Sequence, residues 1–186
     1  MRKIEMNLPN KLTIFRICLI PPFLLFLYLG VFSPANNWIA FGIFVLASVT
    51  DYFDGKIARE RNLITNFGKF MDPLADKLLV CSALIALCQL DRIHGLVVIV
   101  IIAREFIISG FRLIAADKGI VIAASWWGKV KTFVQMVAVM LLVIDFKNMP
   151  MFVITQILVY VALGLTVISL IDYLRKNRDI LYQDKQ

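Results

Sequence analysis

The chain has 186 residues, a formal net charge of +7 and an apolar fraction of 60%. Soluble domains are about 45–50% apolar, and several runs here approach the ~20 residues that cross a bilayer, so the composition predicts an integral membrane protein. The length allows one compact bundle and no separate soluble domain of ordinary size. Loop lysines and arginines explain the positive charge, and we expect no nucleic-acid partner because no nucleic-acid motif occurs.

Six apolar segments predict an all-α, polytopic fold with six transmembrane helices. The whole chain, residues 1–186, is expected to be one membrane-embedded catalytic domain, with an interfacial segment at 1–11 and a polar tail at 174–186. Turn-rich breaks such as GVFSPANN, which begins at Gly30, separate the segments. The predicted spans are 12–30, 37–57, 72–90, 95–116, 127–145 and 151–173.

The lysines and arginines predict the orientation. With six spans both termini face one compartment, and of the 20 basic residues only Arg92 and Lys147 fall on the opposite side. The positive-inside rule therefore places both termini, and the connection between the second and third spans, on the cytoplasmic side of the cell membrane.

Four aspartates lie where the second span ends and the third begins. Asp51 and Asp54 are three residues apart, and Asp72 and Asp76 are four apart. On helices each pair shares one face, and a helical hairpin would bring the pairs together. The small residues beside them leave room for a ligand to approach the backbone: they are Gly55, Ala58 and Gly68.

Four carboxylates need compensation, because two unit charges about 4 Å apart repel by about 4 kcal/mol at an effective dielectric of 20. An oxygen-only ligand set selects hard cations, so the acids predict Mg²⁺ or Mn²⁺, with room for two bridged ions. Arg59 and nearby lysines suit an anion such as a diphosphate. The alternative is a solvated hairpin in which the acids pair with Lys56, Arg59 and Lys77.

The string D-x2-D-G-x2-A-R-x8-G-x3-D-x3-D, which ends at Asp76, resembles the signature of the CDP-alcohol phosphotransferases, a family of six-helix membrane enzymes. The resemblance implies transfer of a phosphatidyl or related group from a CDP-linked donor to an acceptor hydroxyl, with release of CMP. It implies metal ligation by Asp51, Asp54, Asp72 and Asp76, with Asp76 also the catalytic base. It further implies nucleotide-diphosphate contacts at Gly55, Ala58, Arg59 and Gly68.

Three outer stretches extend the resemblance from about residue 5 to 175: NLPNKLTIFR, AREFIISGFR and GKVKT. They are similar to bacterial family members that use CDP-diacylglycerol as donor and glycerol-3-phosphate as acceptor. The resemblance also implies a homodimer in the lipid bilayer. Asn10 and Thr13 could line the nucleotide pocket, although a helix-capping role is an equal alternative.

A basic cluster near the ends of the fourth and fifth spans suits the phosphate of the acceptor. Its expected members are Arg104, Arg112, Lys129 and Lys131. Glu105 is expected to pair with or orient one of the arginines. The alternative for each cation is ordinary cytoplasmic loop charge.

Other functions stay open on sequence grounds. The same chemistry could use inositol phosphate, phosphatidylglycerol or serine as acceptor, and an inactive paralogue would share the fold. A divalent-cation transporter is a more distant alternative, because intramembrane acids are typical of ion pathways. The aspartates, however, cluster at one end, and Glu105 has Arg104 beside it as a partner.

Overall fold

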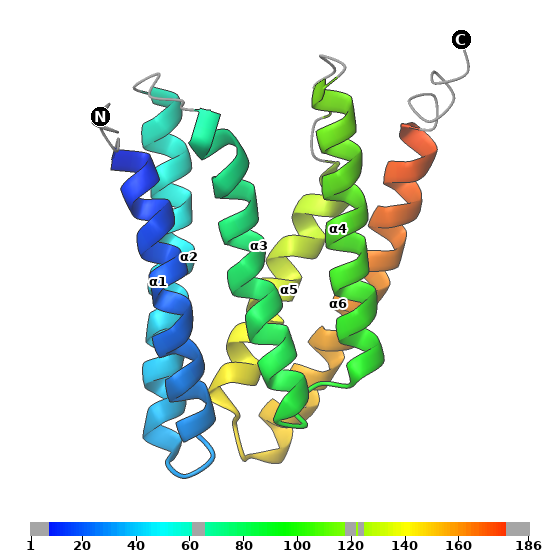
Figure 1. The fold of residues 1–186 in the computed structure, drawn as a ribbon. Helices are drawn as coiled ribbons and strands as arrows, with labels where there is room; N and C mark the ends of the chain where they lie inside the picture. The colour runs from blue at the N-terminus through cyan, green and yellow to red at the C-terminus, as the bar shows by residue number, and fades with distance from the viewer. Residues whose placement is uncertain (1–7, 61–65, 118–121, 123–124, 178–186) are drawn as a thin grey trace. The chain divides into compact units, whose positions relative to one another are not determined.

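The computed structural model describes residues 8–60, 66–117, 122 and 125–177, with the side chains of 8–12, 51–60, 66–73, 76 and 116–117 outside the description. The regular structure in these ranges is helical, which confirms the all-α prediction, and each predicted span lies on one helix (Figure 1). The helices are α1 (Leu8–Leu29), α2 (Pro34–Glu60), α3 (Asn66–Gln89), α4 (Gly95–Asp117), α5 (Trp126–Ile144) and α6 (Met149–Lys176).

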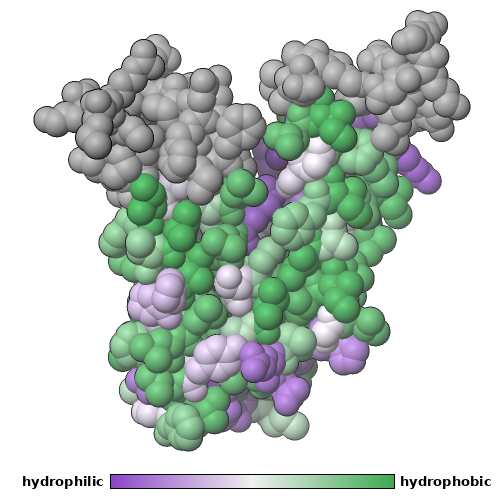
Figure 2. All heavy atoms as spheres, in the orientation of Figure 1, coloured by the Kyte–Doolittle hydropathy of each residue, from purple (hydrophilic) through white to green (hydrophobic). Residues whose placement is uncertain are grey.

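The outward faces of the helices carry apolar side chains. Figure 2 shows hydrophobic surface over much of the helices. Leu25, Ile99 and Phe133 are among the exposed large apolar side chains. Both α5 and α6 are long and apolar enough to cross a membrane, and shorter apolar stretches lie in α1, α2 and α3. An apolar surface of this extent is unsuited to water and suits lipid.

The described helices pack as two units, the first with α1, α2 and α3, and the second with α4, α6 and α5 up to Leu142. In the first unit α1 packs against both α2 and α3. The Phe23 and Phe44 rings meet at a centroid distance of 5.5 Å, which fixes the register between α1 and α2. Buried residues of α1 recur at spacings of three and four, as a helix face requires. They are Thr13, Arg16, Ile20, Phe23 and Leu27.

The second unit depends on close packing of α4 against α6. The buried face of α6 is made largely of small or hydroxyl-bearing residues, which let a neighbouring helix approach. The threonine and serine hydroxyl groups there donate to backbone carbonyl oxygens of the same helix; Thr166, for example, donates to the Ala162 carbonyl oxygen at 2.7 Å. The buried residues of α6 are Thr155, Val159, Ala162, Thr166, Ser169 and Tyr173.

Specific backbone conformations and one buried hydrogen bond occur at the helix ends. Asp91 and Asp145 follow the ends of α3 and α5 with φ values of 55° and 57°, a left-handed conformation that Asp tolerates better than most residues. Asn37 is buried near the start of α2 and donates from Nδ2 to the Ile144 carbonyl oxygen at 3.3 Å. The turn from α1 to α2 brings Gly30 directly beneath the Asn37 side chain.

Gly30 is required by this contact. A Cβ at position 30 would overlap Asn37 Oδ1, and it would lie 2.7 Å from Asn37 Cγ and 3.0 Å from the Leu27 carbonyl oxygen. We expect Gly30→Ala to displace Asn37 and to lower the unfolding free energy by about 1–3 kcal/mol, as overpacking does. Thermal unfolding of detergent-solubilised protein measures the change.

Gly42→Ala is the matched control, since a Cβ at Gly42 meets no atom within 4 Å. Removing a glycine from the interior of α2 should leave stability unchanged or raise it by up to about 1 kcal/mol. Equal melting temperatures for the two variants would contradict the assigned role of Gly30.

Candidate functional site

The signature lies on two helices of the first unit. Its first half, from Asp51 to Arg59, occupies the end of α2, and its second half, from Gly68 to Asp76, occupies the start of α3. Each acid pair therefore lies on a helix, where its spacing puts both members on one face. The side chains of the eight signature residues lie outside the described part of the chain, so the metal and nucleotide contacts stay predictions. They are Asp51, Asp54, Gly55, Ala58, Arg59, Gly68, Asp72 and Asp76.

Helix register ties these positions to the core of the first unit. On α2 the buried residues recur with alternating spacings of three and four at Asn37, Ala40, Phe44 and Ala47. The next positions of that series are 51, 54 and 58. Two of the four aspartate positions thus continue the helix face that packs against α1.

The same relation holds on α3. Leu79, Ala83 and Ala86 are buried and follow the three-and-four spacing of a packed face. The series extends backwards to positions 76 and 72. At the signature end, the helical register of these buried residues thus continues to the aspartate positions.

Buried polar residues of α1 lie at the same level. Arg16 precedes Phe23 by one heptad and Asp51 follows Phe44 by one heptad, each about 10 Å along its helix. Because α1 and α2 run in opposite directions and Phe23 contacts Phe44, positions 16 and 51 come to one level. Thr13, a predicted nucleotide contact, is buried one turn further on, with 1% of its surface exposed. Asn10 lies on α1, with its side chain outside the described residues.

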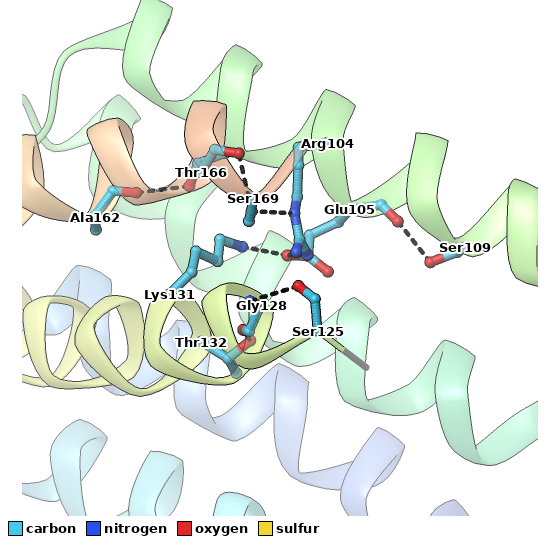
Figure 3. A network of polar contacts seen from close by, with 10 residues as sticks. All are labelled: Arg104, Glu105, Ser109, Ser125, Gly128, Lys131, Thr132, Ala162, Thr166 and Ser169. Atoms are coloured by element: carbon cyan, nitrogen blue, oxygen red, sulfur yellow. Dashed lines mark hydrogen bonds and ion pairs between the residues drawn. The ribbon is translucent and has the colours of Figure 1, made fainter. Parts of the chain in front are cut away.

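The second unit contains a buried polar cluster built from three helices (Figure 3). Arg104 of α4 donates from Nε to Ser169 Oγ of α6 and from Nη1 to Glu105 Oε1, both at 3.1 Å. Lys131 of α5 donates from Nζ to the same Glu105 oxygen. We call Arg104, Glu105, Lys131 and Ser169 the basic cluster.

The basic cluster holds more positive than negative charge in a place removed from water. The Lys131 side chain is 1% exposed and that of Arg104 is 9% exposed, while Glu105 is 20% exposed. Two buried cations share one carboxylate oxygen. Buried cations are suited to a phosphate group, which they bind through charge-assisted hydrogen bonds.

The start of α5 is shaped to fit against this cluster. Ser125 precedes the helix, and its Oγ accepts the Gly128 backbone N–H at 3.1 Å, the contact of an N-cap. A Cβ at Gly128 would lie only 3.3 Å from Arg104 Nη2. The glycine therefore lets the Arg104 guanidinium approach the first turn of α5, and a side chain there would push it away.

The structure separates the four predicted phosphate-binding cations into two pairs. Arg104 and Lys131 meet at Glu105, whereas Arg112 and Lys129 are exposed. Arg112 lies over the Tyr173 ring, with Cζ 6.0 Å from the ring centroid.

Two residues of the basic cluster, Glu105 and Ser169, were not among the predicted phosphate-binding residues. Glu105 pairs with Arg104 as expected, and its contact with Lys131 adds a role that adjacency in sequence did not indicate. The contact of Ser169 with Arg104 could not be predicted from the sequence, because the two residues lie on different helices. Among the side chains that the structure describes, no group of three or more His, Cys, Asp or Glu could hold a metal ion.

Comparison with known proteins agrees with the signature. A family model described as CDP-alcohol phosphatidyltransferase matches residues 6–168. A protein of Bacillus subtilis (strain 168) named "CDP-diacylglycerol--glycerol-3-phosphate 3-phosphatidyltransferase" is 44% identical over 190 residues, covering 94% of this chain and 97% of its own. A protein of the same name from Haemophilus influenzae (strain ATCC 51907 / DSM 11121 / KW20 / Rd) is 40% identical over 186 residues, covering 98% and 99%.

A third relative carries a related name. The "Probable phosphatidylglycerophosphate synthase" of Mycobacterium tuberculosis (strain ATCC 25618 / H37Rv) is 44% identical over 176 residues, covering 94% of this chain and 83% of its own. These matches and the complete signature on α2 and α3 lead to one conclusion: the chain belongs to the CDP-alcohol phosphatidyltransferase family of membrane proteins.

Proposed function

We propose that this chain transfers the phosphatidyl group of CDP-diacylglycerol to glycerol-3-phosphate, giving phosphatidylglycerophosphate and CMP in phospholipid biosynthesis. The observation that carries the proposal is near full-length identity of 40–44% to relatives named for this reaction. The complete signature supports the donor chemistry, and the buried basic cluster supports a phosphorylated acceptor.

The donor set fits divalent cations. Asp51, Asp54, Asp72 and Asp76 provide only oxygen ligands, from two helix faces, which matches Mg²⁺ or Mn²⁺ and allows two ions. When bound, the ions neutralise charge on the diphosphate and stabilise the CMP leaving group. The small residues Gly55, Ala58 and Gly68, with Arg59, Asn10 and Thr13, are assigned to the nucleotide and diphosphate.

In the proposed reaction Asp76 accepts the proton of the acceptor hydroxyl as its oxygen attacks the phosphatidyl phosphorus. The new bond joins that oxygen to phosphorus, and the bond between this phosphorus and the CMP oxygen breaks. Arg104 and Lys131 hold the acceptor phosphate through buried, charge-assisted hydrogen bonds. The exposed Arg112 and Lys129 attract the anion toward the cluster.

The same proposal includes topology and assembly. We assign all six helices to the membrane as one catalytic domain, with residues 1–11 at the interface and 174–186 as a cytoplasmic tail. Both termini and the signature then face the cytoplasm, as the positive-inside rule favours. The active form is proposed to be a homodimer.

The reaction is tested by CMP release from purified protein with CDP-diacylglycerol and Mg²⁺ or Mn²⁺. We expect release with glycerol-3-phosphate and none with inositol phosphate, phosphatidylglycerol or serine. Asp76→Asn should reduce kcat by about 10²–10⁴-fold, the usual contribution of a general base. Release with a different acceptor would overturn the acceptor assignment, and an active Asp76→Asn variant would overturn the base.

The charge balance of the basic cluster predicts the behaviour of Glu105→Gln. This change leaves Arg104 and Lys131 without their shared anion, and we expect a loss of about 2 kcal/mol in unfolding free energy. Millimolar inorganic phosphate should restore part of the lost melting temperature, because it replaces the missing negative charge.

Asp172→Asn is the matched control for this variant. Asp172 pairs with Lys176 on the surface of α6, where the lysine side chain is 64% exposed. An exposed pair contributes only about 0–1 kcal/mol. Equal stability of the two variants, or no response of Glu105→Gln to phosphate, would contradict an anion-binding cluster.

A further inference from the structure

Tyr173 has a buried hydroxyl group with no hydrogen-bond partner among the described residues. The residue lies on α6 and is 3% exposed, yet its Oη makes no hydrogen bond. The ring itself is well packed, edge-on to Phe111 at a centroid distance of 6.2 Å. Leaving a buried hydroxyl unsatisfied costs about 1–3 kcal/mol, so phenylalanine would suit this packing better unless the hydroxyl has a ligand.

Gln135 shows the same feature on α5. The residue is 5% exposed, and its carboxamide oxygen makes no hydrogen bond to any described residue. Amide oxygen and nitrogen exchange places on a simple flip, so the observation concerns the whole carboxamide. A leucine or methionine would fill such a position without this cost.

Both groups flank the basic cluster. Tyr173 follows Ser169 by one turn of α6, and Gln135 follows Lys131 by one turn of α5. Side chains on a helix lean toward its N-terminus, so Tyr173 leans toward the level of Ser169 and Gln135 leans toward that of Lys131. Because α5 and α6 run in opposite directions, the two groups approach the cluster from opposite ends.

We propose that the Tyr173 hydroxyl and the Gln135 carboxamide are further binding groups for the acceptor, an inference that rests on the proposed function. Tyr173 lies on the cationic side, with Arg112 over its ring, and donates to a phosphate oxygen. Gln135 lies one turn beyond Lys131 on α5 and hydrogen-bonds a free hydroxyl of the acceptor. The ligand class is a small phosphorylated alcohol that bears more than one hydroxyl.

The test uses Tyr173→Phe, which removes one oxygen atom and keeps the ring packing. Calorimetric titration of the purified protein with glycerol-3-phosphate in the presence of Mg²⁺ should show about tenfold weaker binding, the equivalent of about 1.4 kcal/mol. The KM for the acceptor should rise by a similar factor, with the KM for CDP-diacylglycerol unchanged. The melting temperature without ligand should stay equal or rise, since an unsatisfied group is removed.

Tyr160→Phe is the control, because Tyr160 lies on the same helix with an exposed side chain. It should change neither binding nor melting temperature. Gln135→Met, which keeps length and loses the polar atoms, should weaken glycerol-3-phosphate binding while inorganic phosphate binds as before. Tyr173→Phe should weaken the binding of both ligands.

Unchanged acceptor binding in Tyr173→Phe and in Gln135→Met, with unchanged or higher stability, would overturn the inference. The two residues would then be buried polar groups with no role in binding. Wild-type protein that binds inositol phosphate instead of glycerol-3-phosphate would overturn the proposed acceptor alone. In that case the affinities of Tyr173→Phe and Gln135→Met for inositol phosphate would test the inference, and unchanged affinities would overturn it. Wild-type protein that binds neither alcohol would overturn both.

Discussion

The second unit depends on one carboxylate shared by two buried cations. Glu105 accepts from both Arg104 and Lys131, and these contacts tie α4 to α5, while Arg104 ties α4 to Ser169 of α6. Among apolar helices such charges could not stay buried singly, because the cost of removing them from water exceeds what any one pair returns. The small residues of α6 and Gly128 of α5 bring the backbones close enough for these short contacts.

In the first unit the organising constraint is helix register. The apolar and small residues that pack α1, α2 and α3 follow spacings of three and four, and the same series reaches the acid positions at the end of α2 and the start of α3. One periodic pattern thus specifies both the core and the placement of the acids. A shift of α2 by one residue would turn positions 51 and 54 by about 100° away from this face, so the packing upstream sets the site downstream.

The sequence was sufficient for the elements of the fold and for the family. Apolar runs and turn residues predicted six helices, which the structure confirms, and the spacing of the aspartates identified the signature. It also indicated the Arg104–Glu105 pair, since the two residues are adjacent. Arg104 and Arg112 were expected in one basic cluster; they are separated by about 80° of rotation around α4, and Arg104 is buried while Arg112 is exposed.

Contacts between helices were beyond prediction for a physical reason. Lys131 with Glu105, Arg104 with Ser169, and Phe111 with Tyr173 each join residues from different helices. A single sequence records which residues share a face of one helix, and it does not record which neighbour that face meets. In the sequence, Ser169 and Tyr173 look like ordinary residues of a buried helix face. Only the tertiary structure shows that Ser169 accepts from the Arg104 guanidinium and that the Tyr173 hydroxyl has no hydrogen-bond partner among the described residues.

The two units solve opposite electrostatic problems for ligands of the same charge. The diphosphate of the donor and the phosphate of the acceptor are both anionic, and the acid positions of α2 and α3 repel an anion until divalent cations reverse their sign. The basic cluster needs no such reversal, because Arg104 and Lys131 are themselves cationic. In this proposal donor binding therefore depends on metal concentration, whereas acceptor binding depends on preorganised side chains.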